Sequence, residues 1–426
     1  MPFTNKLLRP PNGFSLKKHI LAIVATCTFV SHSTMASDAV TLSDAIKLTL
    51  ANHPELTSYQ FKQNMASGVI EQSKQVSPLS IELSIEDALG TGSYSGLSSL
   101  QTSLSISWLM EEDLAQARLN VANQQYQSIE VEKKINQLDV AADTARIFIT
   151  ILSQQQQLKL AKLSHQQASA MLNDIEKRNN IGQLSEVDKF RAQADLVQKS
   201  LLVEDLEHEI IASKAQLSAQ WQQQQENISV VGNLQQIPQV KSLASIKQQL
   251  SDNPALLILA NKQRIAQAQI KQAKQSALPA WQFSAGIKRN EAVDDFGVIA
   301  GVSIPFGTKP RNTGEIRKLG AQQQLFESQA TAWYQAKATE LLLLTHKLGH
   351  FQHVVEGLSQ KSIPALEKAL SAAKQAYLAG SYRYSDWYSI QQELTAAQQE
   401  LILAYTNIHL FNIDIERLTG AAISDI

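Results

Sequence analysis

Three histidines at helical spacing are the residues of this chain best suited to bind a metal ion. His346, His350 and His353 follow at i, i+4 and i+7, so a helix would carry the three imidazoles on one face. Zn²⁺ accepts imidazole ligands, and the spacing therefore permits a weak, transient metal contact. No carboxylate pattern such as His-Glu-x-x-His accompanies them. The alternative interpretation is the polar face of a long helix.

Other motifs give no sign of catalysis. The segment 90–96, GTGSYSG, lacks the Gly-Lys-Ser/Thr ending of a phosphate loop and separates two expected strands, so we interpret it as a hairpin loop. Beyond position 36 the methionines are Met65, Met110 and Met171, which are too few for a thioether relay of Cu(I). No pair of nucleophile and base is recognisable. We therefore predict no catalytic residue, no cofactor and no enzyme activity.

The charge balance argues against nucleic acid as a partner. The chain of 426 residues has 38 basic and 39 acidic side chains, a net charge of −1. A protein that binds nucleic acid non-specifically needs an excess of Lys and Arg to neutralise phosphates. We expect no nucleic-acid partner.

The N-terminal residues have the pattern of a secretory signal peptide. Basic residues precede the apolar run Ile20–Val30, which is too short to span a bilayer, and Ala36 supplies a small residue at a cleavage site. We predict a signal peptide over residues 1–36. Cys27, the sole cysteine, lies in this run, and whether it carries a lipid stays open. The mature chain would have no disulfide and no thiolate metal site.

Two segments that lie 200 residues apart are alike. Ile46–Gln75 and Ile246–Gln275 share 12 of 30 residues without a gap. Chance would give about two or three matches, so the chain is internally duplicated. We predict a single domain over 37–426 that consists of two repeats, about 41–221 and 242–420.

Four short segments alternate apolar and polar residues with the period of a β-strand. They are Leu79–Glu86, Leu100–Trp108, Trp281–Ile287 and Phe296–Ile304. Each has about nine residues, the length of a tilted strand that crosses a bilayer. The alternation fits either a membrane barrel or a soluble hairpin with one buried face. Four strands cannot close a barrel in lipid, so the membrane interpretation requires several copies of the chain.

Long amphipathic segments follow the strands in each repeat. Leu114–Arg178 has no proline, and Gly314–Leu378 matches it, with an expected bend at Pro364. A helix of roughly 65 residues is about 100 Å long. Gly182 and Gly380 follow these helices, where a left-handed glycine is a common stop. Returning helices are expected over 185–221 and 385–418, which makes each pair an antiparallel hairpin.

This ordered set of features resembles the TolC-type outer-membrane efflux channel family over essentially the whole mature chain. The motifs that carry the resemblance are Asn52-His53-Pro54-Glu55-Leu56, Asp252-Asn253-Pro254-Ala255-Leu256, Pro305-Phe306, Arg311-Asn312-Thr313-Gly314, the turns 180–188 and 377–386, and Leu418-Thr419-Gly420. The segment from Pro305 to Gly314, together with Pro364, resembles the cobalt-zinc-cadmium branch of that family, the outer-membrane component of heavy-metal resistance-nodulation-division (RND) systems.

The resemblance implies a mainly α fold with a small β part. Long duplicated helical hairpins would form an α-barrel, and four strands per chain would join a trimeric transmembrane β-barrel of twelve strands. It implies a homotrimer in outer-membrane lipid that extends into the periplasm. It also implies two protein partners, a periplasmic adaptor (membrane fusion) protein and an inner-membrane pump of the RND type. The chain would passively conduct substrates, divalent metal cations among the candidates, out of the cell.

The resemblance also implies roles for residues at the two hairpin turns. Asp188 and Asp386 are similar to the acids of the family's periplasmic aperture. Tyr377, with Tyr382 or Arg383, is similar to the contact that holds the aperture shut. The turns themselves, at Gly182, Leu184 and Gly380, would dock the adaptor.

A second hypothesis is a structural or adhesive coiled-coil protein of the cell surface without a pore. It shares the long helices, but it does not explain why paired strands recur at the same place in each repeat. Conductance in planar bilayers separates the two hypotheses. The sequence does not name the transported substrate.

Overall fold

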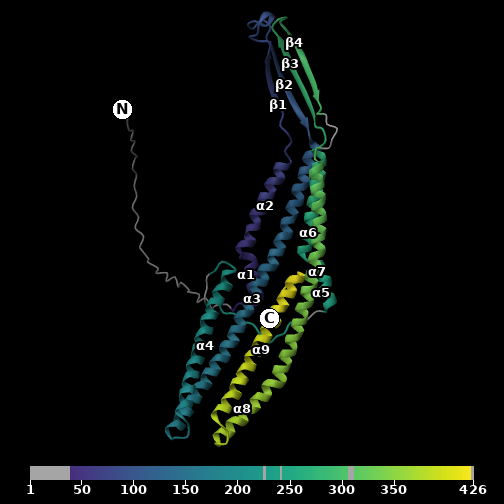
Figure 1. Cartoon of the computed structure of the whole chain (residues 1–426). Helices are drawn as coiled ribbons and strands as arrows, with labels where there is room; N and C mark the ends of the chain where they lie inside the picture. The colour runs from purple at the N-terminus through teal and green to yellow at the C-terminus, as the bar shows by residue number, and fades with distance from the viewer. Residues whose placement is uncertain (1–38, 224–226, 240–241, 306–310, 424–426) are drawn as a thin grey trace, which may run out of the picture. The chain divides into compact units, whose positions relative to one another are not determined.

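The computed structural model describes residues 39–223, 227–239, 242–305 and 311–423. The predicted signal peptide, Cys27 and Phe306 lie outside these residues. Within them, the first half contains α1 (Leu42–Asn52), α2 (Pro54–Ser73), β1 (Ser80–Glu86), β2 (Gln101–Met110), α3 (Glu112–Asn180) and α4 (Glu186–Ala219). The second half contains α5 (Leu243–Ser251), α6 (Pro254–Gln275), β3 (Trp281–Asn290), β4 (Asp295–Ser303), α7 (Thr313–Gly357), α8 (Ile363–Leu378) and α9 (Tyr384–Thr419). The order of helices and strands thus recurs as the sequence predicts (Figure 1).

Caps and prolines explain how the first helices of each half begin. Thr41 accepts a hydrogen bond from the Asp44 N–H and forms a capping box at the start of α1. Pro54 and Pro254 occupy the first helical position of α2 and α6, where a missing N–H costs nothing. The prolines therefore start new helices. Asn253 caps α6 through a 2.7 Å bond from the Ala255 N–H to its Oδ1.

The second long helix is interrupted where the sequence predicts a bend. A π-helical turn over Leu358–Ser362 separates α7 from α8, and Pro364 lies in the first turn of α8. Proline cannot donate to the carbonyl four residues earlier, and a wider turn accommodates its ring.

The four strands form one antiparallel sheet in the order β1-β2-β3-β4. The register pairs Leu83 with Leu104, Leu104 with Ile287, and Ile287 with Val298, so apolar side chains form rows on one face. That face is open, since Leu83 is 64% exposed and Val298 87% exposed. The other face is mainly Ser, Gln and Gly, as the alternation predicts, and the register adds the charged Glu82, Glu86 and Lys288 to it. A soluble hairpin would bury the apolar face against the chain, which the described residues do not do.

The long helices pack side by side below the sheet. α3 packs against α2, α4, α6 and α9, while α6 also packs against α7. Two ion pairs join α3 to α9, from Arg146 to Asp414 and from Arg417 to Asp139, both at 2.6 Å. Among the described residues, no helix has the length and apolarity to cross a membrane.

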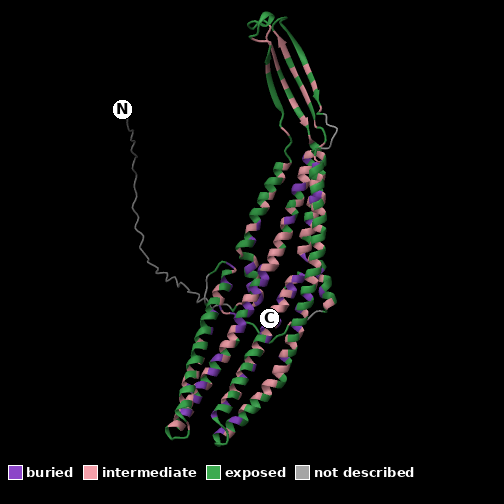
Figure 2. Cartoon of the chain, in the orientation of Figure 1, coloured by how far each residue is buried: buried purple, intermediate pink, exposed green. Residues whose placement is uncertain are grey.

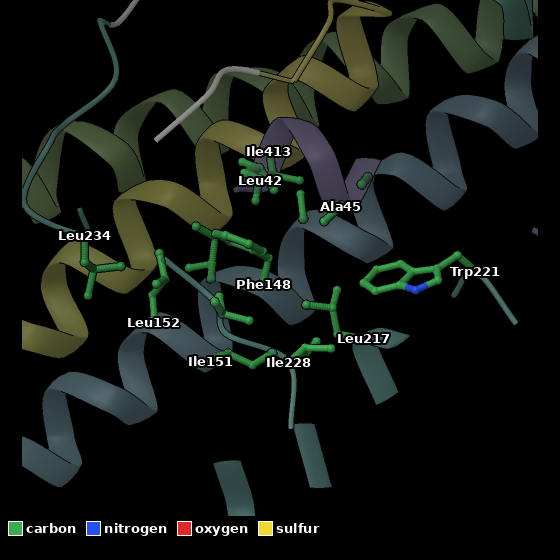
Figure 3. Packing of buried hydrophobic residues seen from close by; sticks show 14 residues of the cluster. Leu42, Ala45, Phe148, Ile151, Leu152, Leu217, Trp221, Ile228, Leu234 and Ile413 are labelled. Atoms are coloured by element: carbon green, nitrogen blue, oxygen red, sulfur yellow. The ribbon is translucent and has the colours of Figure 1, made fainter. Parts of the chain in front are cut away.

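The largest buried cluster lies at mid-length of α3. Phe148 is fully buried among residues of α1, α4, α9 and the segment 228–234, which crosses the helices (Figure 3). A Cβ at Gly232 would lie 2.8 Å from Leu152 Cδ1, so a larger residue there would require the end of the Leu152 side chain to shift. Two smaller buried clusters lie elsewhere, one between α7 and α9 and one at the hairpin ends of α3 and α8. Along the rest of the helices, buried residues alternate with intermediate and exposed ones (Figure 2). The helices therefore leave long faces uncovered within one chain.

Candidate functional site

Both helical hairpins reverse at a left-handed glycine. Gly182 follows α3 with φ of +74°, and Gly380 follows α8 with φ of +77°. Their N–H groups donate to Asn179 O at 2.9 Å and to Tyr377 O at 3.0 Å. A residue with a Cβ is strained at such φ values, which is why the sequence places glycine at both turns.

An open groove of about 610 Å³ lies between the two hairpin tips. It brings together most of the residues that the sequence singles out, namely Leu184, Asp188, Tyr377, Gly380, Tyr382 and Arg383. Gly182 and Asp386 are not among its lining residues. Arg178 also lines the groove, and no sequence motif marks it as a site residue.

Tyr377 connects the two hairpins through residues of α3. Its hydroxyl donates to Asp174 Oδ2 at 3.2 Å, and Arg178 Nε donates to the same oxygen at 3.0 Å. The Arg178 guanidinium also lies 4.8 Å from the centre of the Tyr377 ring. We call this contact the Asp174–Tyr377 bridge. One carboxylate thus accepts from both hairpins and holds them together.

The structure places Arg178, rather than Arg383, against Tyr377. Arg383 is exposed at the N-cap of α9, and Tyr382 is 39% exposed. A sequence signal for the missed residues does exist. Asp174 and Arg178 form an i, i+4 acid–base pair in the last turns before Gly182, at the same end of the hairpin as Tyr377.

The two predicted aperture acids lie in the first turns of the returning helices. Ser185 Oγ donates to Asp188 Oδ2 at 2.8 Å, and Ser385 Oγ donates to Asp386 Oδ1 at 3.1 Å. A carboxylate at a helix N-terminus is stabilised by the helix dipole. Asp188 is half-buried and Asp386 is exposed, so both carboxylates lie at the surface of the tip.

Aromatic side chains fill the space behind the groove. Tyr377 stacks on Trp387 with ring centres 4.9 Å apart, and Tyr384 stacks on Tyr388 at 5.8 Å. Burial, followed by the charge of Asp195, raises the pKa of Tyr384 to about 12. Burial and a hydrogen bond with Asp195 of α4 also raise the pKa of Tyr388. A second tyrosine–aspartate contact therefore links α9 to α4.

Tyr377 should ionise late in an alkaline titration. Burial and then the charge of Asp174 raise its pKa from 10.0 to about 12. Because the folded-state pKa is the higher one, the stabilisation from the protonated hydroxyl is complete below pH 10 and is lost as the pH rises through about 12. In an alkaline titration followed by tyrosinate absorbance, Tyr377→Phe should show one late-ionising tyrosine fewer than the wild type. Loss of an early-ionising group instead would contradict the buried bridge.

The three histidines do not assemble a metal site within one chain. His346, His350 and His353 are exposed on α7. Across the described residues, no group of three or more His, Cys, Asp or Glu side chains could hold a metal ion. The predicted weak metal contact therefore has no three-ligand site here.

Known proteins of similar sequence or structure are outer-membrane channels or metal-resistance proteins. No family model matches the chain. The cobalt-zinc-cadmium resistance protein CzcC of Cupriavidus metallidurans is 21% identical over 388 residues, which cover 90% of this chain and 91% of CzcC. Among solved structures, the outer-membrane channel OprN matches with a TM-score of 0.74 at 14% identity, covering 91% of each chain.

Two further structures agree with that match. The channel protein CusC gives a TM-score of 0.71 at 16% identity and covers 90% of this chain and 93% of its own. The outer-membrane protein VceC of Vibrio cholerae also gives 0.71 at 16% identity, covering 90% and 97%. The chain therefore has the fold of these outer-membrane channel proteins, with duplicated helical hairpins and a four-stranded sheet. The resemblance to TolC-type channels is confirmed at the level of the fold.

Proposed function

We propose that the chain is one protomer of a homotrimeric outer-membrane efflux channel that conducts substrates passively out of the cell. The observation that carries this proposal is the sheet, which exposes an apolar face and has free edges at β1 and β4. In lipid, an open sheet edge is not tolerated, and closure requires further copies. Three copies would supply twelve strands, with the polar face, which carries Ser, Gln and Gly together with Glu82, Glu86 and Lys288, lining the lumen.

Residues 37–426 would form a single channel domain. The long helices would extend the duct into the periplasm, and the tips would form its aperture. The turns at Gly182, Leu184 and Gly380 would meet a periplasmic adaptor protein, and an inner-membrane pump of the RND type would supply the energy. CzcC is named for cobalt, zinc and cadmium resistance. On that likeness we propose divalent metal cations as the transported substrate.

The test of the channel is conductance of the purified full chain in planar bilayers, together with outer-membrane fractionation. We expect an outer-membrane, heat-sensitive trimer that conducts ions. A soluble monomer without conductance would overturn the proposal and favour the surface coiled-coil alternative. For the substrate, a deletion strain should become susceptible to zinc, cobalt, cadmium, nickel or copper; susceptibility to dyes and antibiotics alone would reject metal cargo.

The aperture role of Asp188 and Asp386 has its own test. If three copies of each carboxylate surround the opening, Asp188→Ala with Asp386→Ala should lower the affinity of divalent cations that block the current. A ring of like charges in a narrow passage with walls of low dielectric constant attracts ions of the opposite charge strongly. Single-channel recordings with added divalent cation measure the block. An unchanged blocking concentration would exclude both residues from the aperture.

A further inference from the structure

The histidines of α7 lie on the side of the helix opposite its packed side. His346, His350 and His353 are exposed. Leu344 and Leu348 belong to the buried cluster that α7 forms with α5 and α9, and each lies about 160° around the helix from His346. The imidazoles are therefore accessible to an ion from solution within one chain.

His346 and His350 are four residues apart in a regular stretch of helix. α7 runs unbroken from Thr313 to Gly357, and the π-helical turn begins only at Leu358. Residues at i and i+4 are neighbours on a helix surface, with Cβ atoms about 5–6 Å apart. A zinc ion lies about 2.0–2.1 Å from an imidazole nitrogen, so one ion fits between two such side chains. We call His346 and His350 the α7 histidine pair.

His353 lies too far from His346 to share an ion with it. Seven residues correspond to about 10.5 Å along the helix axis. His353 is close enough to His350, but at i+3 it lies about 60° around the helix from that residue, whereas His346 lies about 40° from it. The i, i+4 pair is therefore the better aligned of the two.

The face around the α7 histidine pair differs from an ordinary solvated helix face. Such a face usually carries charged side chains. Here the residues beside the pair are Leu342, Leu343 and Gly349. A Cβ at Gly349 would meet nothing within 4 Å, so the surface beside the pair has room for water that completes the coordination of an ion.

The two imidazoles of the pair are not engaged by other polar groups. In the part of the chain that the structure describes, neither ring forms a hydrogen bond or an ion pair. The His350 ring makes an edge contact with Phe351, with ring centres 5.3 Å apart. Lys347 is the neighbouring cation, and its Nζ lies 5.5 Å from the centre of the Phe411 ring of α9. Its charge is therefore drawn toward the packed side of α7.

The other histidines of the chain occur singly. No other two histidines lie within seven residues of each other in the sequence. His208 of α4 lies 4.0 Å from Glu204. His409 is buried, and its Nε2 lies 2.9 Å from Leu234 O. The α7 face is thus the place where two imidazoles can bind the same ion.

We propose that the α7 histidine pair binds one divalent transition-metal ion per chain through two imidazole nitrogens, with water as the remaining ligands. Imidazole suits Zn²⁺, Co²⁺, Ni²⁺ and Cu²⁺, whereas Mg²⁺ and Ca²⁺ prefer oxygen ligands. Two protein ligands give a weak, exchangeable site, in keeping with the lack of a three-ligand group among the described residues. A role for the pair in export rests on the proposed metal cargo, but binding itself does not.

Isothermal titration calorimetry with ZnCl₂ tests the pair in the full chain, purified without a histidine tag and stripped of metal. We expect one Zn²⁺ per chain. His346→Ala and His350→Ala should each lower the affinity roughly tenfold or more, since one imidazole then remains of two. His208→Ala removes an exposed histidine from α4 and should leave the affinity unchanged. MgCl₂ should give no saturable binding.

A variant with the same number of histidines separates their spacing from their count. His350→Gln combined with Gln352→His places the second imidazole six residues from His346, about 120° around the helix. We expect this variant to bind as weakly as His350→Ala. Wild-type affinity in either of them would overturn the α7 histidine pair. A larger loss in His353→Ala than in His346→Ala would assign the ion to other residues and overturn it as well.

The susceptibility of the deletion strain separates failure of the pair from failure of the metal cargo. A strain that is susceptible to metals, with a chain that shows no saturable Zn²⁺ binding, would overturn the pair and leave the cargo standing. Zn²⁺ binding that is lost in His350→Ala, with a strain that is susceptible to dyes and antibiotics alone, would support the pair and reject the cargo.

Discussion

If the chain forms the proposed channel, Asp174→Ala is expected to open its tip and to raise the single-channel conductance several-fold. The substitution removes the oxygen that accepts from both Tyr377 and Arg178, at 3.2 Å and 3.0 Å. A partly exposed, charge-assisted contact of this kind contributes about 1–2 kcal/mol. Losing it in each copy would shift the balance between closed and open tips by about five- to thirty-fold per copy. Conductance in planar bilayers measures the shift.

Two matched variants separate the bridge from a general effect of losing a carboxylate. Tyr377→Phe keeps the ring against Trp387 and removes only the hydroxyl, so we expect a smaller increase in conductance. Asp143→Ala removes a carboxylate that pairs with Arg146 on α3, far from Gly182 along the helix, and should leave conductance unchanged. Wild-type conductance in Asp174→Ala would show that the bridge does not hold the tip closed.

Periodicity predicts the helices and strands of this chain because each has one apolar side. The change from a period of 3.6 to a period of two locates β1 to β4 within a few residues. The hairpin turns follow from glycine at 182 and 380, whose left-handed backbone is unfavourable for other residues. These are local effects, and the sequence contains them in full.

The partners within the site depend on contacts between distant residues. Asp174 and Tyr377 lie 203 residues apart, and the i, i+4 pair of Asp174 with Arg178 does not by itself indicate that Tyr377 of the other hairpin is the third partner. The three histidines also show what spacing alone leaves open. Their spacing correctly predicts one exposed face of α7, but whether further ligands lie opposite depends on the fold. Resemblance therefore locates the tip, and the structure identifies the residues that bridge it.

Phe148→Ala should be the most destabilising single substitution that the buried cluster allows. Phe148 is fully buried where α1, α3, α4, α9 and the segment 228–234 meet (Figure 3). Truncation would remove the ring from a fully buried position and leave a cavity among the side chains of this cluster. Burial of this kind contributes about 3–5 kcal/mol. Thermal unfolding of the detergent-solubilised protein should show a clearly lower midpoint.

Phe190→Ala is the matched control, since Phe190 is 61% exposed on α4 and should change stability by less than about 0.5 kcal/mol in one chain. Equal midpoints for the two variants would mean that the cluster around Phe148 does not hold the helices together. The cluster bears on function because it lies on α3 between the sheet and the tip. With 14 buried residues it is the largest of the three buried clusters among the described residues, and it joins α1, α3, α4 and α9 at one level. The tip bridge, which contributes less, can then open while that level stays intact.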